Sequence, residues 1–154
     1  MDGLKENLLT KVVTALVAEH AALAKALDDS SAAATDPGSK AEGKYDTRSL
    51  EMSYLAAGQA RQAEGLLESI EQLKRFELPT YTITDAVDLG ALVEVEQGGE
   101  WSHFLLLPVG GGIELEEDEM QVTTLTPDSP LFAQLEGKKV GERMETGSMV
   151  SEVS

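Results

Sequence analysis

Acidic side chains supply most of the chemistry that this sequence could perform. Three of them, Glu42, Asp46 and Glu51, follow one another at spacings of four and five residues. Carboxylate oxygens are the ligands that Mg²⁺ prefers, and two carboxylates on one helical face can share an ion. Side chains on a helix turn by about 100° per residue, so Asp46 and Glu51 would diverge by about 140°. Glu42 and Asp46 would converge on a helix, but Gly43 lies between them and weakens that helix.

Other candidate sites have simpler explanations. The acidic run at residues 114–119 lacks the glycine and the ligand spacing of a calcium loop, so we expect an acidic hairpin. Ser129 has no His and Asp partners at recognisable positions, which favours a helix cap over a nucleophile. His20 has no second His or Cys nearby, which favours a packed histidine over a ligand. We therefore predict no catalytic residue, no metal site and no cofactor for this chain.

The charge of the chain is strongly negative and unevenly distributed. The 154 residues include 28 acidic and 12 basic ones, for a formal net charge of −16. Residues 1–78 contain 13 acidic and 9 basic side chains, whereas residues 79–154 contain 15 and 3. Proteins bind nucleic acid by neutralising phosphates with Lys and Arg, so we expect no direct high-affinity binding to nucleic acid. An acidic protein suits a basic protein surface or a metal-bearing channel.

Cysteine usage and hydropathy indicate the compartment. The sequence contains no cysteine, which excludes disulfides and thiolate metal sites. It has no run of about 18 apolar residues, and its start lacks the basic and apolar regions of a signal peptide. We therefore expect a cytoplasmic protein that does not insert into a membrane.

Two long helices are predicted for the first half. Over residues 3–28 the spacings are 4, 3, 4, 3 and 4, at Leu9, Val13, Leu16, His20, Leu23 and Leu27. Over residues 48–77 they are 3 and 4, at Ala56, Gln59, Ala63, Leu66, Ile70 and Leu73. Such spacing is typical of a coiled-coil seam. The polar stretch 29–46 carries an Asp-Pro-Gly turn signal, so we expect residues 1–78 to form an antiparallel coiled-coil hairpin with this stretch as a loop at its tip.

The second half changes to a strand-like pattern after Pro79. Strands are predicted at residues 81–83, 91–95, 103–107 and 121–124, with a weak last strand within 146–154. Gly98-Gly99 and the glycines 110–112 supply hairpin turns. Ser129 is the expected N-cap of a short helix that starts at Pro130 and ends at Leu135. The fold class is therefore α+β, and residues 79–154 form an acidic domain with a small antiparallel sheet and one short helix.

Three segments resemble the Gre family of bacterial transcription elongation factors. Residues 129–141 read Ser-Pro-Leu-Phe-Ala-Gln-Leu-Glu-Gly-Lys-Lys-Val-Gly and resemble that family's Ser-Pro to Leu-x-Gly-Lys-x-x-Gly signature. Residues 87–93 resemble the strand that opens its C-terminal domain, and residues 54–73 resemble the returning helix of its coiled coil. Together these likenesses cover most of the chain, in the order that the family has them.

The resemblance implies an FKBP-like second domain that docks at the rim of the secondary channel of RNA polymerase, with the coiled coil entering the channel. Its candidate polymerase contacts are Ser129, Pro130, Lys138 and Lys139. In the family, acids at the tip help to hold the polymerase's Mg²⁺ and promote cleavage of backtracked RNA, a role that would fall to Glu42, Asp46 and Glu51. The family's first two tip acids are three residues apart, and the different spacing here counts against stimulated cleavage.

The expected function is that of an accessory factor that binds RNA polymerase and modulates elongation, with no active site of its own. Two alternatives stay open. A prolyl isomerase of FKBP-like fold would need a pocket of several aromatics, and the second half offers Tyr81, Trp101, Phe104 and Phe132. A coiled-coil adaptor would suit the helical seam equally well. A hairpin formed within one chain predicts a monomer, whereas an intermolecular coiled coil predicts a dimer.

Overall fold

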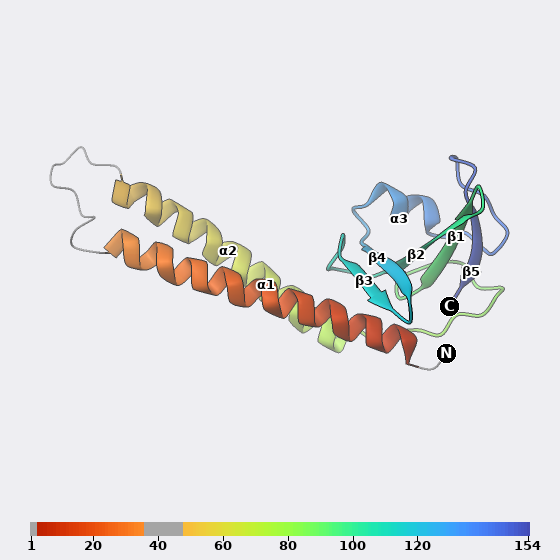
Figure 1. The fold of residues 1–154 in the computed structure, drawn as a ribbon, viewed down its shortest axis with the longest axis horizontal. Coiled ribbons are helices and arrows are strands. Elements are labelled where there is room, and N and C mark those ends of the chain that lie inside the picture. Colours follow the sequence, from red (N-terminus) through yellow and green to blue (C-terminus); the bar gives the residue numbers. More distant parts are fainter. Residues whose placement is uncertain (1–2, 36–47) are drawn as a thin grey trace. The chain divides into compact units, whose positions relative to one another are not determined.

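Two long helices come first in the chain, and a sheet with one short helix follows them (Figure 1). The computed structural model describes residues 3–35 and 48–154. Its helices are α1 (Leu4–Thr35), α2 (Arg48–Arg75) and α3 (Pro130–Leu135). Its strands are β1 (Leu92–Gln97), β2 (Glu100–Leu106), β3 (Glu114–Glu117), β4 (Met120–Leu125) and β5 (Met149–Val153). The order of elements confirms the predicted α+β class.

The chain divides into two compact units. One comprises Met1–Val13 together with Gln72–Ser154, and the other comprises Thr14–Glu71. The first turns of α1 and the last residues of α2 therefore belong with the sheet. The predicted division into domains 1–78 and 79–154 stays a prediction. No helix in the part of the chain that the structure describes is long and apolar enough to cross a membrane.

The helical seams follow the predicted spacing, with one shift. All six predicted seam residues of α2 are buried or half-buried. On α1 the fully buried residues are Leu8, Val12 and Leu16, whereas Leu9 and Val13 of the predicted seam are half-buried. Spacings of three and four describe the direction of an apolar stripe, but adjacent columns of a helix satisfy them almost equally. The packing of the two helices as a coiled coil stays a prediction.

The predicted loop at residues 29–46 begins too early. α1 continues to Thr35, because residues 32–34 are all alanine and alanine has the highest helix propensity. The Asp-Pro-Gly turn signal at residues 36–38 lies outside the described residues. α2 agrees with the prediction to within two residues, since it was expected to end at residue 77 and ends at Arg75.

The sheet is mixed, so the prediction of an antiparallel sheet is wrong for one pair of strands. The strand order is β3-β4-β2-β1-β5. β2 and β4 run parallel, whereas the other neighbouring pairs are antiparallel. After β2 the chain crosses to the edge of the sheet, forms β3 there, and returns as β4 between β3 and β2. Because β3 is inserted in the chain between them, β4 runs parallel to β2, whereas consecutive strands of a simple meander would be antiparallel. The FKBP-like character of the sheet stays a prediction.

One predicted turn is confirmed and another is wrong. Gly98-Gly99 joins β1 to β2 with φ of 61° and 84°, values that favour glycine. The glycines 110–112 lie between β2 and β3, which are not neighbours in the sheet. The hairpin next to β4 instead turns at Asp118-Glu119, with φ of 51° and 64°. The acidic run 114–119 thus forms the hairpin that was expected there.

The predicted strand at residues 81–83 is wrong. This segment forms a turn in which the Asp85 carboxylate accepts hydrogen bonds from the Thr82 amide at 2.8 Å and hydroxyl at 3.0 Å. A short apolar and β-branched run satisfies the strand pattern, but a side chain that bonds locally to the backbone stabilises a turn instead. The last predicted strand is confirmed as β5.

The two faces of the sheet differ. On one face, which we call the α3 face, Val93, Val95 and Leu106 share a core with Phe132 and Leu135 of α3. On the opposite face, Leu92, Leu105 and Val122 are buried outside that core. Farther along the same strands the opposite face carries Glu94, Glu96, Trp101 and His103, and Glu152 of β5 lies opposite Glu94. We call these five residues the carboxylate face.

Candidate functional site

The predicted tip acids do not form a site in the described structure. Glu42 and Asp46 lie outside the described residues, and Glu51 is exposed in the first turn of α2. Across residues 3–35 and 48–154, no group of three or more His, Cys, Asp or Glu side chains is placed to hold a metal ion. A role of the tip acids at the polymerase's Mg²⁺ therefore stays a prediction.

The signature segment forms α3 and the turn after it. Pro130 occupies the start of the helix as predicted, and Ser129 before it is extended, with φ −78° and ψ 132°. The expected cap is wrong in one detail, because the Ser129 side chain makes no capping hydrogen bond. The proline ring already holds φ near its helical value, and the Ser129 carbonyl accepts from the Ala133 amide at 3.2 Å. The hydrogen bond at the start of this helix is therefore accepted by the Ser129 carbonyl and not by its hydroxyl.

Two separate segments of the family resemblance meet in the structure. The Gly137 amide donates to the Val87 carbonyl at 2.8 Å, and the Val87 amide donates to the Lys138 carbonyl at 2.8 Å. Gly137 has φ +83°, a conformation that favours glycine. Val87 is buried in the core with Phe132. The residues that precede β1 and the residues that follow α3 are thus held together by a reciprocal pair of backbone bonds.

The lysines and the arginine of the acidic half lie in the segment that follows α3. The three basic residues of 79–154 are Lys138, Lys139 and Arg143. Lys139 is exposed and Lys138 is half-buried. The Lys139 amide donates to Glu142 Oε1 at 3.1 Å, and the Arg143 guanidinium donates to the Gly147 carbonyl at 2.8 Å. The two lysines predicted to contact the polymerase follow closely on α3, whose first residue is Pro130, and their contact with polymerase stays a prediction.

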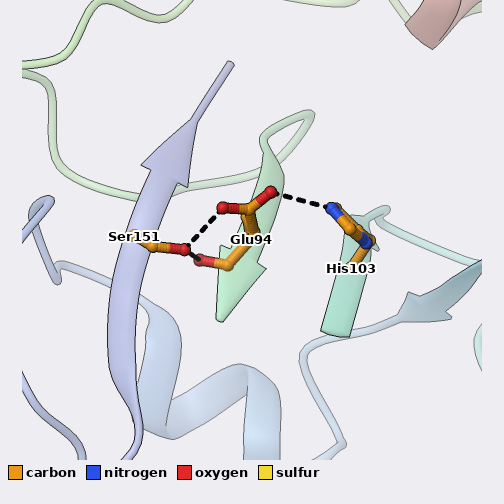
Figure 2. Close-up of polar contacts among 3 residues, drawn as sticks. All are labelled: Glu94, His103 and Ser151. Carbon is orange, nitrogen blue, oxygen red and sulfur yellow. Dashed lines mark hydrogen bonds and ion pairs between the residues drawn. The ribbon is translucent and has the colours of Figure 1, made fainter. Parts of the chain in front are cut away.

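The sheet register places Glu94 between two polar partners (Figure 2). His103 Nε2 on β2 lies 3.0 Å from Glu94 Oε2. The Ser151 hydroxyl on β5 is shared between Glu94 Oε1 at 2.8 Å and the Glu94 carbonyl at 3.1 Å. Ser151 is the extra residue where the β1–β5 register shifts, and such bulges re-aim a side chain. Both carboxylate oxygens are hydrogen-bonded, yet 26% of the Glu94 side chain stays exposed.

This arrangement is not a nucleophilic triad. In such a triad the imidazole lies between the serine hydroxyl and the carboxylate, so that it can take the hydroxyl proton. Here the carboxylate of Glu94 lies between Ser151 and His103, so the imidazole has no hydroxyl to activate. Glu152 adds a second carboxylate directly opposite Glu94. The group can bind a cation or a hydrogen-bond donor, and its geometry does not activate Ser151 through the imidazole.

A cleft of about 720 Å³ borders the carboxylate face. The start of α1, the segment 78–81 and the sheet line it, and Glu94, His103 and Glu152 are among the lining residues. Leu4, Leu78, Leu92 and Met120 contribute apolar surface to the same cleft. The cleft therefore has both the apolar wall and the few convergent polar groups that binding sites commonly show.

Lys5 of α1 lines this cleft, and its ammonium group makes its hydrogen bonds within the protein. Its ammonium donates to the carbonyls of Pro79 at 2.6 Å, Gly90 at 2.8 Å and Ser154 at 3.1 Å. It also lies 5.1 Å from the centroid of the Tyr81 ring. Burial lowers the pKa of Lys5 below its ordinary value, although Glu6 acts in the opposite direction. Three acceptors satisfy all three ammonium protons, so Lys5 has no proton left for another carboxylate.

The pairing of Glu94 with His103 was missed, although the sequence contained a signal for it. A two-residue turn at Gly98-Gly99 pairs residues that lie equally far on either side of it, and Glu94 and His103 do. Ser151 and Glu152 carried no such signal, because no turn joins β5 directly to β1. Lys5 carried none either, since its acceptors are backbone carbonyls that any residue supplies.

No protein-family model matches this chain, and no curated protein matches it. Solved structures of low identity do. The GreA factor homolog 1 (Gfh1) of Thermus thermophilus is 18% identical, with 92% of this chain and 94% of that chain covered and a TM-score of 0.37. Gfh1 of Thermus aquaticus is 17% identical over 91% and 92%, with a TM-score of 0.36. A further structure described as the transcription factor Gfh1 is 19% identical over 92% of each chain, with a TM-score of 0.35.

Proposed function

We propose that this chain is a Gre-like accessory factor that binds RNA polymerase at the secondary channel and modulates transcription elongation. The observation that carries the proposal is the reciprocal backbone pairing of Val87 with residues 137 and 138. It joins two segments, 87–93 and 129–141, that resemble the same family domain and lie far apart in sequence. If the resemblance of the two segments were a coincidence, there would be no reason to expect them to contact each other in the fold.

The charge of the chain fits a protein partner. Residues 79–154 carry 15 acidic and 3 basic side chains, so this half cannot neutralise many phosphates. The proposed factor therefore reaches nucleic acid only through the polymerase. It acts in the cytoplasm as a monomer, and any RNA cleavage is carried out by the polymerase's own active site.

Binding is tested by a pull-down of RNA polymerase on the purified full chain at moderate salt. Wild type should retain polymerase, and Lys138→Ala/Lys139→Ala should retain about tenfold less, because lost charge pairs at an interface weaken association. Lys74→Ala/Arg75→Ala is the matched control, since it also removes two neighbouring positive charges from the same compact unit, both of them exposed. Absence of wild-type binding would overturn the proposal.

Cleavage is a separate test on a stalled, backtracked polymerase complex. Wild type and Glu42→Ala/Asp46→Ala are compared for shortening of the RNA. Carboxylates that secure a weakly held metal should be needed for any stimulation. Equal shortening with both proteins would remove these residues from the mechanism, and no shortening with wild type would leave a factor that modulates elongation without cleavage.

The two alternatives find less support. Among the described residues that line the cleft, Tyr81 is the one Phe, Tyr or Trp, and its hydroxyl donates to the Leu89 carbonyl at 2.7 Å. A prolyl isomerase pocket needs several aromatics, and an isomerisation assay on a model peptide tests that activity directly. Size measurement in solution tests the adaptor, because an intermolecular coiled coil predicts a dimer.

A further inference from the structure

We propose that the carboxylate face binds an arginine side chain from an extended basic segment of a protein partner. In this proposal Glu94 and Glu152 accept the guanidinium, and Trp101 stacks against it. The inference goes beyond the proposed function, because it specifies the chemistry of a bound segment and does not require that the segment belong to RNA polymerase.

The spacing of the two carboxylates suits one guanidinium. Glu94 on β1 and Glu152 on β5 are direct cross-strand partners. Side chains in such pairs have Cβ atoms about 4.5–5.5 Å apart and lie on the same face. The planar guanidinium presents several N–H donors in a fixed fork, which lets it bond to two carboxylate groups at once. Each Glu94 oxygen has one bonded partner and keeps a second lone pair for a ligand.

Carboxylates outnumber cationic side chains at this place. Glu6, Glu94 and Glu152 line the cleft together with Lys5, and His103 shares a hydrogen bond with Glu94 Oε2 at 3.0 Å. Lys5 is held by three carbonyls and pairs with none of these carboxylates in the described contacts. Like charges placed directly opposite each other in a sheet repel, so an incoming cation removes a cost that the free protein bears.

Trp101 supplies exposed apolar surface on the same face of the sheet, two strand positions from His103. It is 60% exposed, which is unusual for a large aromatic side chain on a sheet. It lies two residues before His103 on β2, about 7 Å away on the same face, and opposite Glu96. An arginine stacks on an indole ring through its flat face while its edge bonds to carboxylates. Tryptophan and arginine are also among the residues most enriched at protein-binding hot spots.

Binding is tested with the full chain and a capped hexapeptide in which three arginines alternate with glycines. Trp101 is the single tryptophan of the chain, so its fluorescence reports directly on the proposed face. We expect a saturable fluorescence change at near-physiological salt. The matching lysine peptide should bind several-fold more weakly, because an ammonium cannot bridge two carboxylates as a guanidinium does.

The decisive variant is Glu94→Gln/Glu152→Gln, which should weaken arginine-peptide binding about tenfold by removing both charge-assisted acceptors. Its charge-matched control is Glu114→Gln/Glu136→Gln, which neutralises two exposed carboxylates away from the face and should change binding less than twofold. If the double variant does not fold, Glu152→Gln alone is tested instead, because this side chain is exposed. The single substitution should weaken binding of the arginine peptide about threefold.

Two results would overturn the proposal. One is equal weakening by the face variant and the control variant, which would indicate general attraction to an acidic protein. The other is the absence of a saturable change with wild type. The polymerase pull-down is read independently, so polymerase binding without peptide binding rejects this inference alone, and the reverse outcome rejects the proposed function alone.

Discussion

The two faces of the sheet differ in the kind of side chains that they carry. The α3 face is apolar along its central strands, with Val93, Val95 and Leu106 packed in one core with Phe132. The opposite face is buried at Leu92 and at other apolar residues, and then gives way to carboxylates and an exposed tryptophan on the same strands. The first face contributes mainly burial of apolar surface. The second face places the like charges of Glu94 and Glu152 opposite each other, which costs stability and suits a binding surface.

The largest expected effect concerns the α3 face. Phe132→Ala should lower the free energy of unfolding by about 3–5 kcal/mol, because it removes a buried aromatic ring from the core and leaves a cavity. Urea unfolding measures this change. Val17→Ala is the control, since Val17 is 46% exposed and its truncation should cost well under about 1 kcal/mol. Equal losses from both variants would mean that α3 does not complete the core.

The next effect concerns the lysine that enters the cleft. Lys5→Met keeps most of the apolar stem but removes the ammonium donor from the carbonyls of Pro79, Gly90 and Ser154, of which Ser154 keeps its bond from the Leu92 amide. We expect a loss of about 1–3 kcal/mol in the free energy of unfolding, the usual range for unsatisfied acceptors. Lys25→Met on the exposed side of α1 should change it by less than about 0.5 kcal/mol. If the two variants unfold at the same urea concentration, the three carbonyl contacts contribute little.

A smaller effect of opposite sign tests the carboxylate face. Glu152→Gln should raise the free energy of unfolding by about 0.2–1 kcal/mol at neutral pH, because it removes the like charge opposite Glu94. The gain should shrink in high salt, which screens exposed charges. Glu136→Gln removes an equal charge elsewhere and serves as the control. A loss of stability in Glu152→Gln alone would contradict the view that this face bears a cost.

The smallest effect is a pH dependence at the edge of the sheet. Lys11 Nζ lies 2.5 Å from Glu117 Oε2, and this hydrogen bond holds the pKa of Glu117 below its ordinary value of 4.5. A lowered carboxyl pKa adds stability above pH 4.5 that is lost as pH falls through the folded-state value. The difference in urea midpoint between wild type and Lys11→Met should therefore be larger at pH 7 than at pH 3. A difference that grows toward pH 3 would have the wrong sign.

Most of the elements could be predicted from the sequence. The spacing on α2, the turn at Gly98-Gly99 and the proline at the start of α3 are local signals, and each is confirmed. The predicted secondary structure was wrong where one local sequence pattern is compatible with two conformations. The run at residues 81–83 resembles a strand until the Asp85 carboxylate bonds back to Thr82. The helix α1 continues through Ser30 and Ser31, because the alanines that follow them favour a helical conformation.

The candidate site was less predictable than the elements that carry it. The hairpin turn implies the pairing of Glu94 with His103 once both strands are placed. The approach of Glu152 and Ser151 depends on a strand that lies more than fifty residues later in the chain. The bulge that turns Ser151 toward Glu94 has no signature in composition or spacing.

The sequence by itself determined most of the helical and extended segments, where α3 begins, and which half carries the negative charge, because these properties depend on residues within a few positions of one another. Only the tertiary structure decided that β4 lies parallel to β2, that Glu94 faces Glu152, and that Lys5 fills three carbonyl acceptors. Those features require one register out of several that satisfy the same alternating pattern, and the register is selected by packing between distant segments.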